Sequence, residues 1–248
     1  MTAGSATHAE PHHAASAGRR ARWSRGWHLA LAVMIACAFV VQVVLVLTGG
    51  EDANSGDSGT QVGTWTRMVR LLSYFTIQSN LLVLASSTFV ALAPAHDSTL
   101  LRVLRLDAVL GIAVTGLIFA TVLASQVHLT GWALACTIAF HYIAPVAAVL
   151  GWLLFGPRNR LDPATLAWSV LWPLAWIAYT LLHGAVTGWY PYPFLDVSLK
   201  GYPVALRNVA GVAVMTLLFI AALWWLDRVL PPRAPRPVRT EHKDRGPR

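Results

Sequence analysis

Charged residues are scarce in this 248-residue sequence, and acidic residues are the scarcer kind. Only 12% of the chain is charged, with 11 acidic against 19 basic residues, while 56% is hydrophobic and the mean hydropathy is +0.54. A soluble domain has an apolar share of roughly 45–50%. The composition therefore excludes an ordinary soluble protein and predicts an integral membrane protein. We attribute the basic excess to cytoplasmic loops and expect no nucleic-acid partner.

Cysteine is almost absent, and so is the pattern of a cleavable signal. Cys37 and Cys136 both fall within apolar runs at different depths, so we expect no disulfide. Arginines precede the first apolar run, but that run, Trp27–Leu47, exceeds the roughly 7–15 residues of a cleavable signal. We therefore expect an uncleaved first membrane span.

Six apolar segments are long enough to cross a hydrocarbon core that needs about 20 helical residues. They predict an all-α integral membrane protein, a six-transmembrane-helix bundle, with spans Trp27–Thr48, Thr66–Leu92, Leu106–Ser125, Thr130–Phe155, Thr165–Thr187 and Val204–Val229. The transmembrane domain is thus residues 27–230. The flanking tails, 1–26 and the Pro/Arg-rich 231–248, have little to bury and are predicted to be disordered.

The basic residues indicate the orientation of the spans. One side of the predicted bundle, which includes both tails, holds 15 of the 19 Lys and Arg residues. Because cytoplasmic loops are enriched in Lys and Arg, we expect both termini inside a multi-pass protein of the cell membrane. The opposite side carries a long polar first loop, "GGEDANSGDSGTQVG".

The second predicted span carries an unusual number of hydroxyls and amides, in "LSYFTIQSNLLVLASS". At 100° per residue, Ser73, Ser79, Asn80 and Ser87 lie within about 60° of Thr76, while Gln78 points to the opposite side. Such a stripe commonly serves to join helices through hydrogen bonds. We also consider that it faces an internal cavity.

The fourth predicted span places an ionisable residue, His141, inside the membrane, followed one turn later by Pro145. An intramembrane ionisable residue indicates a functional site, and Pro145 is predicted to leave the His141 carbonyl without its helical partner. Counted from Thr66 and Thr130, Thr76 and His141 each lie about 15 Å deep. A hydroxyl and an imidazole at one level are the minimum for nucleophilic acyl chemistry.

The fifth span and the loop after it supply further candidates. His183 and Tyr179 lie one turn apart, and the aromatic, proline-rich loop "GWYPYPFLDVSLKGYP" contains Tyr192. Interfacial aromatic residues explain these features without a function, and the alternative is a cap over a cavity. Asp107 and Asp162 are interpreted as residues near helix starts.

The motifs "YFTIQSN", "FHYIAP" and "HGAVTGWYPYPFLD" resemble those of the androgen-induced gene 1 family, which includes the androgen-dependent tissue-factor-pathway-inhibitor regulating protein. The likeness covers most of Leu71–Asp196. It implies an intramembrane threonine hydrolase that cleaves fatty acid esters of hydroxy fatty acids, with Thr76 as nucleophile and His141 as base. The long first loop, the basic tails and the short gap between His141 and Pro145 indicate a bacterial branch.

The leading hypothesis is thus a lipid esterase in the membrane, with catalytic residues Thr76 and His141. Asn80 or a backbone N–H is expected to stabilise the oxyanion, and the substrate-binding or supporting candidates are Ser73, Asn80, Tyr179, His183 and Tyr192. The alternative is a non-enzymatic protein that binds a lipid or small ligand in a polar pocket.

We expect no cofactor or metal, because His141 and His183 are not matched in depth as haem ligands and only His141 is deep. The partners would be membrane lipids, and the sequence does not define the oligomeric state.

Overall fold

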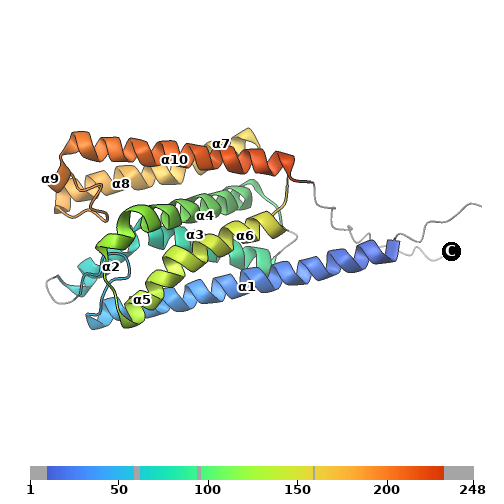
Figure 1. Ribbon diagram of the computed structural model, residues 1–248, viewed down its shortest axis with the longest axis horizontal. Coiled ribbons are helices and arrows are strands. Elements are labelled where there is room, and N and C mark those ends of the chain that lie inside the picture. The colour runs from blue at the N-terminus through green and yellow to red at the C-terminus, as the bar shows by residue number, and fades with distance from the viewer. Residues whose placement is uncertain (1–9, 59–61, 94–95, 159, 232–248) are drawn as a thin grey trace, which may run out of the picture.

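The computed structural model describes residues 10–58, 62–93, 96–158 and 160–231, and these residues form an all-α fold (Figure 1). The elements are α1 (Glu10–Thr48), α2 (Thr64–Ser73), α3 (Phe75–Leu92), α4 (Thr99–Ile118), the π-helical turn η1 (Phe119–Leu123), the 3₁₀ turn η2 (Ala124–Gln126), α5 (Gly131–Ile138), the π-helical turn η3 (Ala139–Ile143), α6 (Ala144–Phe155), α7 (Pro163–Ser169), α8 (Leu171–Thr187), α9 (Val197–Lys200) and α10 (Tyr202–Val229).

Six helical stretches among the described residues are long and apolar enough to cross a membrane, which confirms the predicted six-helix membrane bundle. They are Gly18–Thr48, Phe75–Leu92, Thr99–Gln126, Gly131–Phe155, Pro163–Thr187 and Tyr202–Val229. Helices α3 and α4 lie in the middle of the bundle, between α1 and α6 on one side and α7, α8 and α10 on the other (Figure 1). Among the described residues, α3 carries more buried polar side chains than any other helix.

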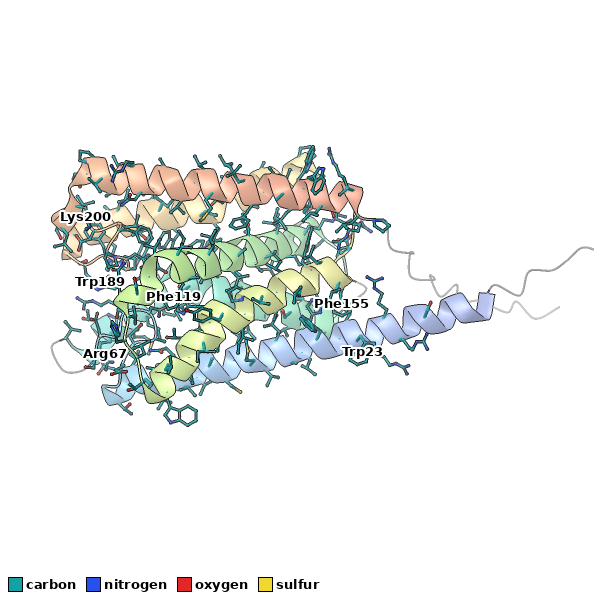
Figure 2. The ribbon with its side chains drawn as sticks, in the orientation of Figure 1. Trp23, Arg67, Phe119, Phe155, Trp189 and Lys200 are labelled. Carbon is teal, nitrogen blue, oxygen red and sulfur yellow. The ribbon has the colours of Figure 1, made fainter. Side chains whose placement is uncertain are left out.

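The second span differs from the prediction of one continuous helix over Thr66–Leu92. Tyr74 is extended, with φ −66° and ψ 129°, and separates α2 from α3. Arg67 of α2 donates to the carbonyl of Val46 in the last turn of α1, at 2.7 Å, and to that of Gly50 just after this helix, so α2 is attached to the end of α1. Arg67 and Trp189 lie at the end of the bundle opposite to Trp23 (Figure 2). The hydropathy pattern alone cannot reveal this side-chain anchor.

The N-terminal tail was predicted to be disordered over residues 1–26, but helix α1 already begins at Glu10. Alanine and arginine in this stretch are strong helix formers. Arg20 and Arg25 also donate to the last carbonyls of two neighbouring helices, Leu154 of α6 and Ala91 of α3. Cationic side chains stabilise helix C-termini, so residues 18–26 extend the first span. Residues 1–9 and 232–248, also predicted to be disordered, lie outside the described part of the chain.

The first loop folds inward against the bundle. Asp52, Ala53 and Asn54 are buried, and the Ala53 N–H donates to the side-chain oxygen of Gln42 on α1 at 3.1 Å. The Ala53 carbonyl accepts a hydrogen bond from the Thr137 hydroxyl on α5 at 2.5 Å. The loop predicted as a polar connection therefore covers one end of α5, one helical turn from His141.

Candidate functional site

Thr76 lies at the second position of α3, directly after the break at Tyr74, and only 2% of it is exposed. The first N–H groups of a helix have no partner within it, and the Thr76 N–H instead donates to the hydroxyl of Tyr192 at 3.1 Å. The Thr76 Oγ1 atom is 3.3 Å from the His141 Nε2 atom and 3.2 Å from the Tyr192 hydroxyl. The hydroxyl and the imidazole proposed from the sequence thus meet in the structure.

His141 stands in the π-helical turn η3 with its ring held from both sides. Its Nδ1 atom is 3.2 Å from the Thr137 carbonyl, and since a carbonyl only accepts, Nδ1 carries the hydrogen. In a neutral ring this leaves the lone pair on Nε2, which faces Thr76. The Thr137 hydroxyl in turn donates to Ala53. The contacts therefore orient Nε2 of the imidazole toward the Thr76 hydroxyl.

The π-helical register changes which carbonyl Pro145 leaves without a partner. We predicted the His141 carbonyl from α-helical spacing, but i to i+5 bonding places Pro145 opposite the Phe140 carbonyl. The side-chain amide of Asn80 on α3 donates to the Phe140 carbonyl at 3.3 Å and to the Thr76 carbonyl at 2.9 Å. Asn80 therefore connects the two helices that carry Thr76 and His141. The sequence had suggested that Asn80 stabilises an oxyanion. Both its amide hydrogens are engaged in these two bonds, so neither remains for that role.

Tyr192 comes from the aromatic loop between α8 and α9 and is buried beside Tyr74, whose ring centroid is 5.7 Å away. The ring of Phe194 stacks on it at 5.4 Å. Burial raises the pKa of the Tyr192 phenol to about 12, so it stays protonated at neutral pH. Its oxygen accepts from the Thr76 N–H, which leaves its own hydrogen available to the Thr76 Oγ1 atom.

Thr76 and His141 still lie at a similar depth in the structure. Depth can no longer be counted from Thr66, because Thr66 belongs to the separate helix α2. Counted from the other helix ends, Thr76 lies 16 residues before Leu92 and His141 lies 14 residues before Phe155. These spacings correspond to about 24 Å and 21 Å of helix. Both residues therefore lie nearer to the end of the bundle that carries α2 and α9.

The remaining candidates form a second, separate group. The Ser73 and Tyr179 hydroxyls are 2.6 Å apart, and Ser73 donates to the Val69 carbonyl. His183 stacks on Tyr179 with ring centroids 5.4 Å apart, and the Thr187 hydroxyl lies 3.4 Å from its Nδ1 atom. No contact recorded for the described residues joins His183 to Thr76 or His141. These side chains attach α8 to α2 and do not extend the Thr76 site.

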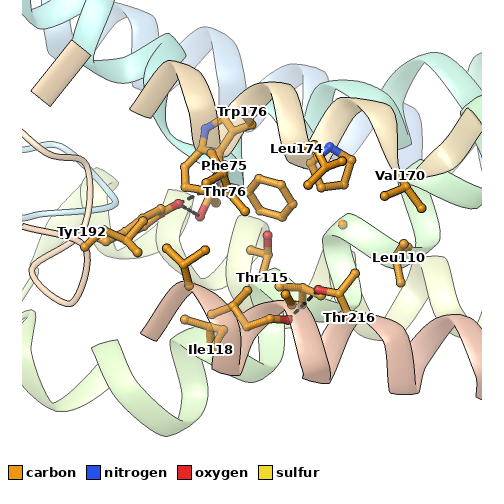
Figure 3. A pocket seen from close by; sticks show the side chains of 18 of the residues that line it. Phe75, Thr76, Leu110, Thr115, Ile118, Val170, Leu174, Trp176, Tyr192 and Thr216 are labelled. Atoms are coloured by element: carbon orange, nitrogen blue, oxygen red, sulfur yellow. Dashed lines mark hydrogen bonds between the residues drawn. The ribbon is translucent and has the colours of Figure 1, made fainter. Parts of the chain in front are cut away.

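An apolar cavity of about 250 Å³ begins at Thr76 and Tyr192 and runs between α4, α8 and α10 (Figure 3). Apolar side chains dominate its lining, from Phe194 and Val209 at one end to Leu110, Val170 and Ile220 at the other. His141 does not line it, so Thr76 stands between the base and the cavity. The sequence suggested a cavity faced by the polar stripe, but Thr76 is the only residue of that stripe in this lining, and most of the walls are ordinary lipid-compatible residues.

Large aromatic side chains hold the cavity open on the α8 side. Trp176 donates its indole N–H to the Ser73 carbonyl at 2.9 Å, and Trp172 donates to the side-chain oxygen of Gln78 at 3.1 Å. The ring of Phe75 stacks on that of Trp172 at 4.6 Å. These rings keep the backbones of α8 and α3 apart.

No group of three or more His, Cys, Asp or Glu side chains is placed to hold a metal ion within the described residues. Comparisons with protein-family models, with curated proteins and with solved structures found no match. The resemblance to the androgen-induced gene 1 family therefore stays a prediction from the quoted motifs.

Proposed function

We propose that this chain is a membrane-embedded hydrolase of lipid esters in which Thr76 is the nucleophile and His141 the general base. The observation that carries the proposal is the position of the Thr76 Oγ1 atom. It lies 3.3 Å from a base nitrogen oriented by a backbone carbonyl, at the mouth of an apolar cavity. A nucleophile, its base and a third group that orients the base are the recurring parts of nucleophilic acyl transfer.

The first half of the reaction forms an acyl-threonine. The Thr76 hydroxyl gives its proton to His141 Nε2 while Oγ1 bonds to the ester carbonyl carbon, and the carbonyl oxygen takes the negative charge. The Tyr192 hydroxyl, whose hydrogen is available beside the Thr76 Oγ1 atom, is the donor for that oxyanion. The C–O bond to the alcohol then breaks, and the imidazolium returns the proton to the leaving alkoxide.

The second half repeats the sequence with water. His141 takes a proton from a water molecule, the hydroxide adds to the acyl carbon, and the bond to Thr76 Oγ1 breaks. The threonine oxygen recovers the proton from the imidazolium, and the carboxylic acid leaves. The enzyme returns to its starting state with one water consumed.

The cavity supports the proposed class of substrate. Its mostly apolar lining suits an alkyl chain, and Thr76 and Tyr192 place hydroxyl groups at one end of it. The resemblance stated above further suggests fatty acid esters of hydroxy fatty acids. The asymmetry in basic residues supports a cell-membrane protein whose termini are cytoplasmic.

An activated-phosphonate probe tests the nucleophile. The wild-type protein and the Ser73→Ala variant are expected to be labelled covalently, and Thr76→Ala is not. Ser73 is a matched control because it is a buried hydroxyl one turn away on the far side of the break. Equal labelling of Thr76→Ala would overturn the assignment. Saturable binding of a lipid ester without product would instead indicate the ligand-binding alternative.

A further inference from the structure

A buried carboxylate on α4 lies outside the site described above. Asp107 is only 6% exposed, and its Oδ1 atom has no hydrogen-bond partner among the described residues. It lies eight residues after Thr99, or about 12 Å along the helix, and not at the helix start as the sequence suggested. A carboxylate inside a membrane span is costly unless a partner compensates it.

Arg102, near this end of α4, is already engaged by two other carboxylates. Arg102 pairs with Asp97 at 3.0 Å and with Asp162 at 3.3 Å, and none of the salt bridges in the described part of the chain includes Asp107. Asp162 is the N-cap of α7 and accepts the Thr165 N–H at 2.8 Å, as its place near a helix start had suggested. The protein therefore supplies Asp107 with no cation in these residues.

Asp107 lines a groove of about 440 Å³ between the first turns of α4 and the α7–α8 pair. Two indoles, from Trp168 and Trp172, and apolar residues such as Val103 and Leu171 form most of its walls. Trp168 is 59% exposed, so this wall is accessible from outside the bundle. The ring of Trp172 stacks on Phe75, which lines the first cavity, so Trp172 stands between the groove and that cavity.

We propose that this groove binds an amphiphilic amine, a molecule with one positive ammonium nitrogen and an alkyl chain. A carboxylate beside indole rings is the chemistry that recognises ammonium groups, through charge pairing and cation–π contact. A bare Mg²⁺ or Ca²⁺ ion would need about six oxygen ligands, whereas Thr99 is the only other polar side chain in the lining. A zwitterionic phospholipid fits less well, because its phosphate would meet no cationic side chain in the walls of the groove.

Native mass spectrometry of the full-length protein in a neutral detergent tests the proposal, with dodecyltrimethylammonium as the probe. One saturable bound molecule is expected, with at least tenfold weaker binding by Asp107→Asn. Asp196→Asn removes an acid near α9, at the opposite end of the bundle, and is expected to bind like wild type. Dodecanol, which has the same chain and no charge, is expected not to compete.

A second variant keeps the test valid if Asp107→Asn fails to fold. Trp168→Ala removes a largely exposed side chain and is expected to weaken binding several-fold without affecting folding. Unchanged binding by both variants, or equal competition by dodecanol, overturns the proposal. Displacement of the probe by phosphatidylethanolamine at comparable concentration would assign the groove to a lipid head group and overturn the assignment to a free amine.

Discussion

The ring of Phe119 lies flat against the imidazole of His141, with centroids 3.9 Å apart and planes inclined by 25°. Both residues stand in π-helical turns, η1 and η3, which occur frequently at functional sites. The stacked ring shields one face of the imidazole, and the hydrogen bond to the Thr137 carbonyl fixes its rotation. Phe119 thus contributes to the alignment of Nε2 with Thr76.

Replacing Phe119 with leucine removes the stacked ring and leaves the imidazole free to tilt. Because small misplacements of a catalytic group reduce rates steeply, we expect kcat on a lipid ester to fall by ~10- to 100-fold. KM is expected to change little, because Phe119 does not line the cavity. Phe89→Leu is the matched control, since Phe89 is 48% exposed on α3. A kcat equal to wild type would exclude this role for Phe119.

Tyr192→Phe removes only the hydroxyl that touches Thr76 at Oγ1 and at the backbone nitrogen. Loss of one oxyanion donor typically reduces kcat by about 10²- to 10³-fold. We expect a fall of this size in steady-state ester hydrolysis, with the ring contacts to Tyr74 and Phe194 retained. Tyr179→Phe, whose hydroxyl contacts Ser73 instead, is expected to keep most of the activity. Similar losses in the two variants would contradict a specific role for Tyr192.

The contact between Thr76 and His141 could be predicted from the sequence. Two polar residues at the same depth in apolar helices are both expected to face the interior of the bundle, where they can meet. The buried stripe of Ser73, Thr76 and Asn80 followed from the same reasoning, and the six-helix fold followed from length and hydropathy. These features depend on the periodicity of one helix and on the properties of the bilayer. None of these features requires knowledge of contacts between distant segments of the chain.

The parts that the sequence did not predict depend on contacts between distant segments. The break at Tyr74 accompanies the anchoring of Arg67 on the end of α1, 17 to 21 residues away. The role of Asn80 depends on the π-helical turn before Pro145, which α-helical spacing conceals. The inward fold of the first loop depends on Gln42 and Thr137, and hydropathy scores those residues only as polar.

Asn80→Ala tests the connection between α3 and the π-helical turn η3. The variant leaves the Phe140 carbonyl without its partner in a buried setting, which typically costs about 1–3 kcal/mol. We expect a loss of this size in the free energy of unfolding in mixed micelles, together with reduced activity. Thr88→Ala on the same helix removes only a bond to its own helix and is expected to cost less. Equal stability of Asn80→Ala and wild type would show that another group satisfies this carbonyl.

Gly184→Ala tests whether α8 positions the aromatic loop. A Cβ atom at this position would overlap the ring of Tyr190, which packs directly on the helix. The ring must move away, and the loop that carries Tyr192 moves with it. We expect a fall in kcat of about tenfold or more, because Tyr192 leaves the Thr76 hydroxyl. Gly188→Ala is unsuitable as a control, because its φ of +70° is itself strained for alanine. Gly211→Ala meets open space and is expected to retain wild-type rates.

If the proposed function holds, we expect the far end of the apolar cavity to limit which acyl chains reach Thr76. Ile220 lines that end, 11 residues or about 16 Å along α10 from Val209 near Tyr192. Ile220→Trp would fill it, so long acyl esters should lose kcat/KM by ten-fold or more while short ones keep it. Leu218→Trp adds the same bulk to a neighbouring side chain that is 66% exposed, and no change in chain-length preference is expected. The two variants are compared on a series of esters that differ only in acyl length. An equal loss for every chain length in Ile220→Trp would show that the chain does not enter this cavity.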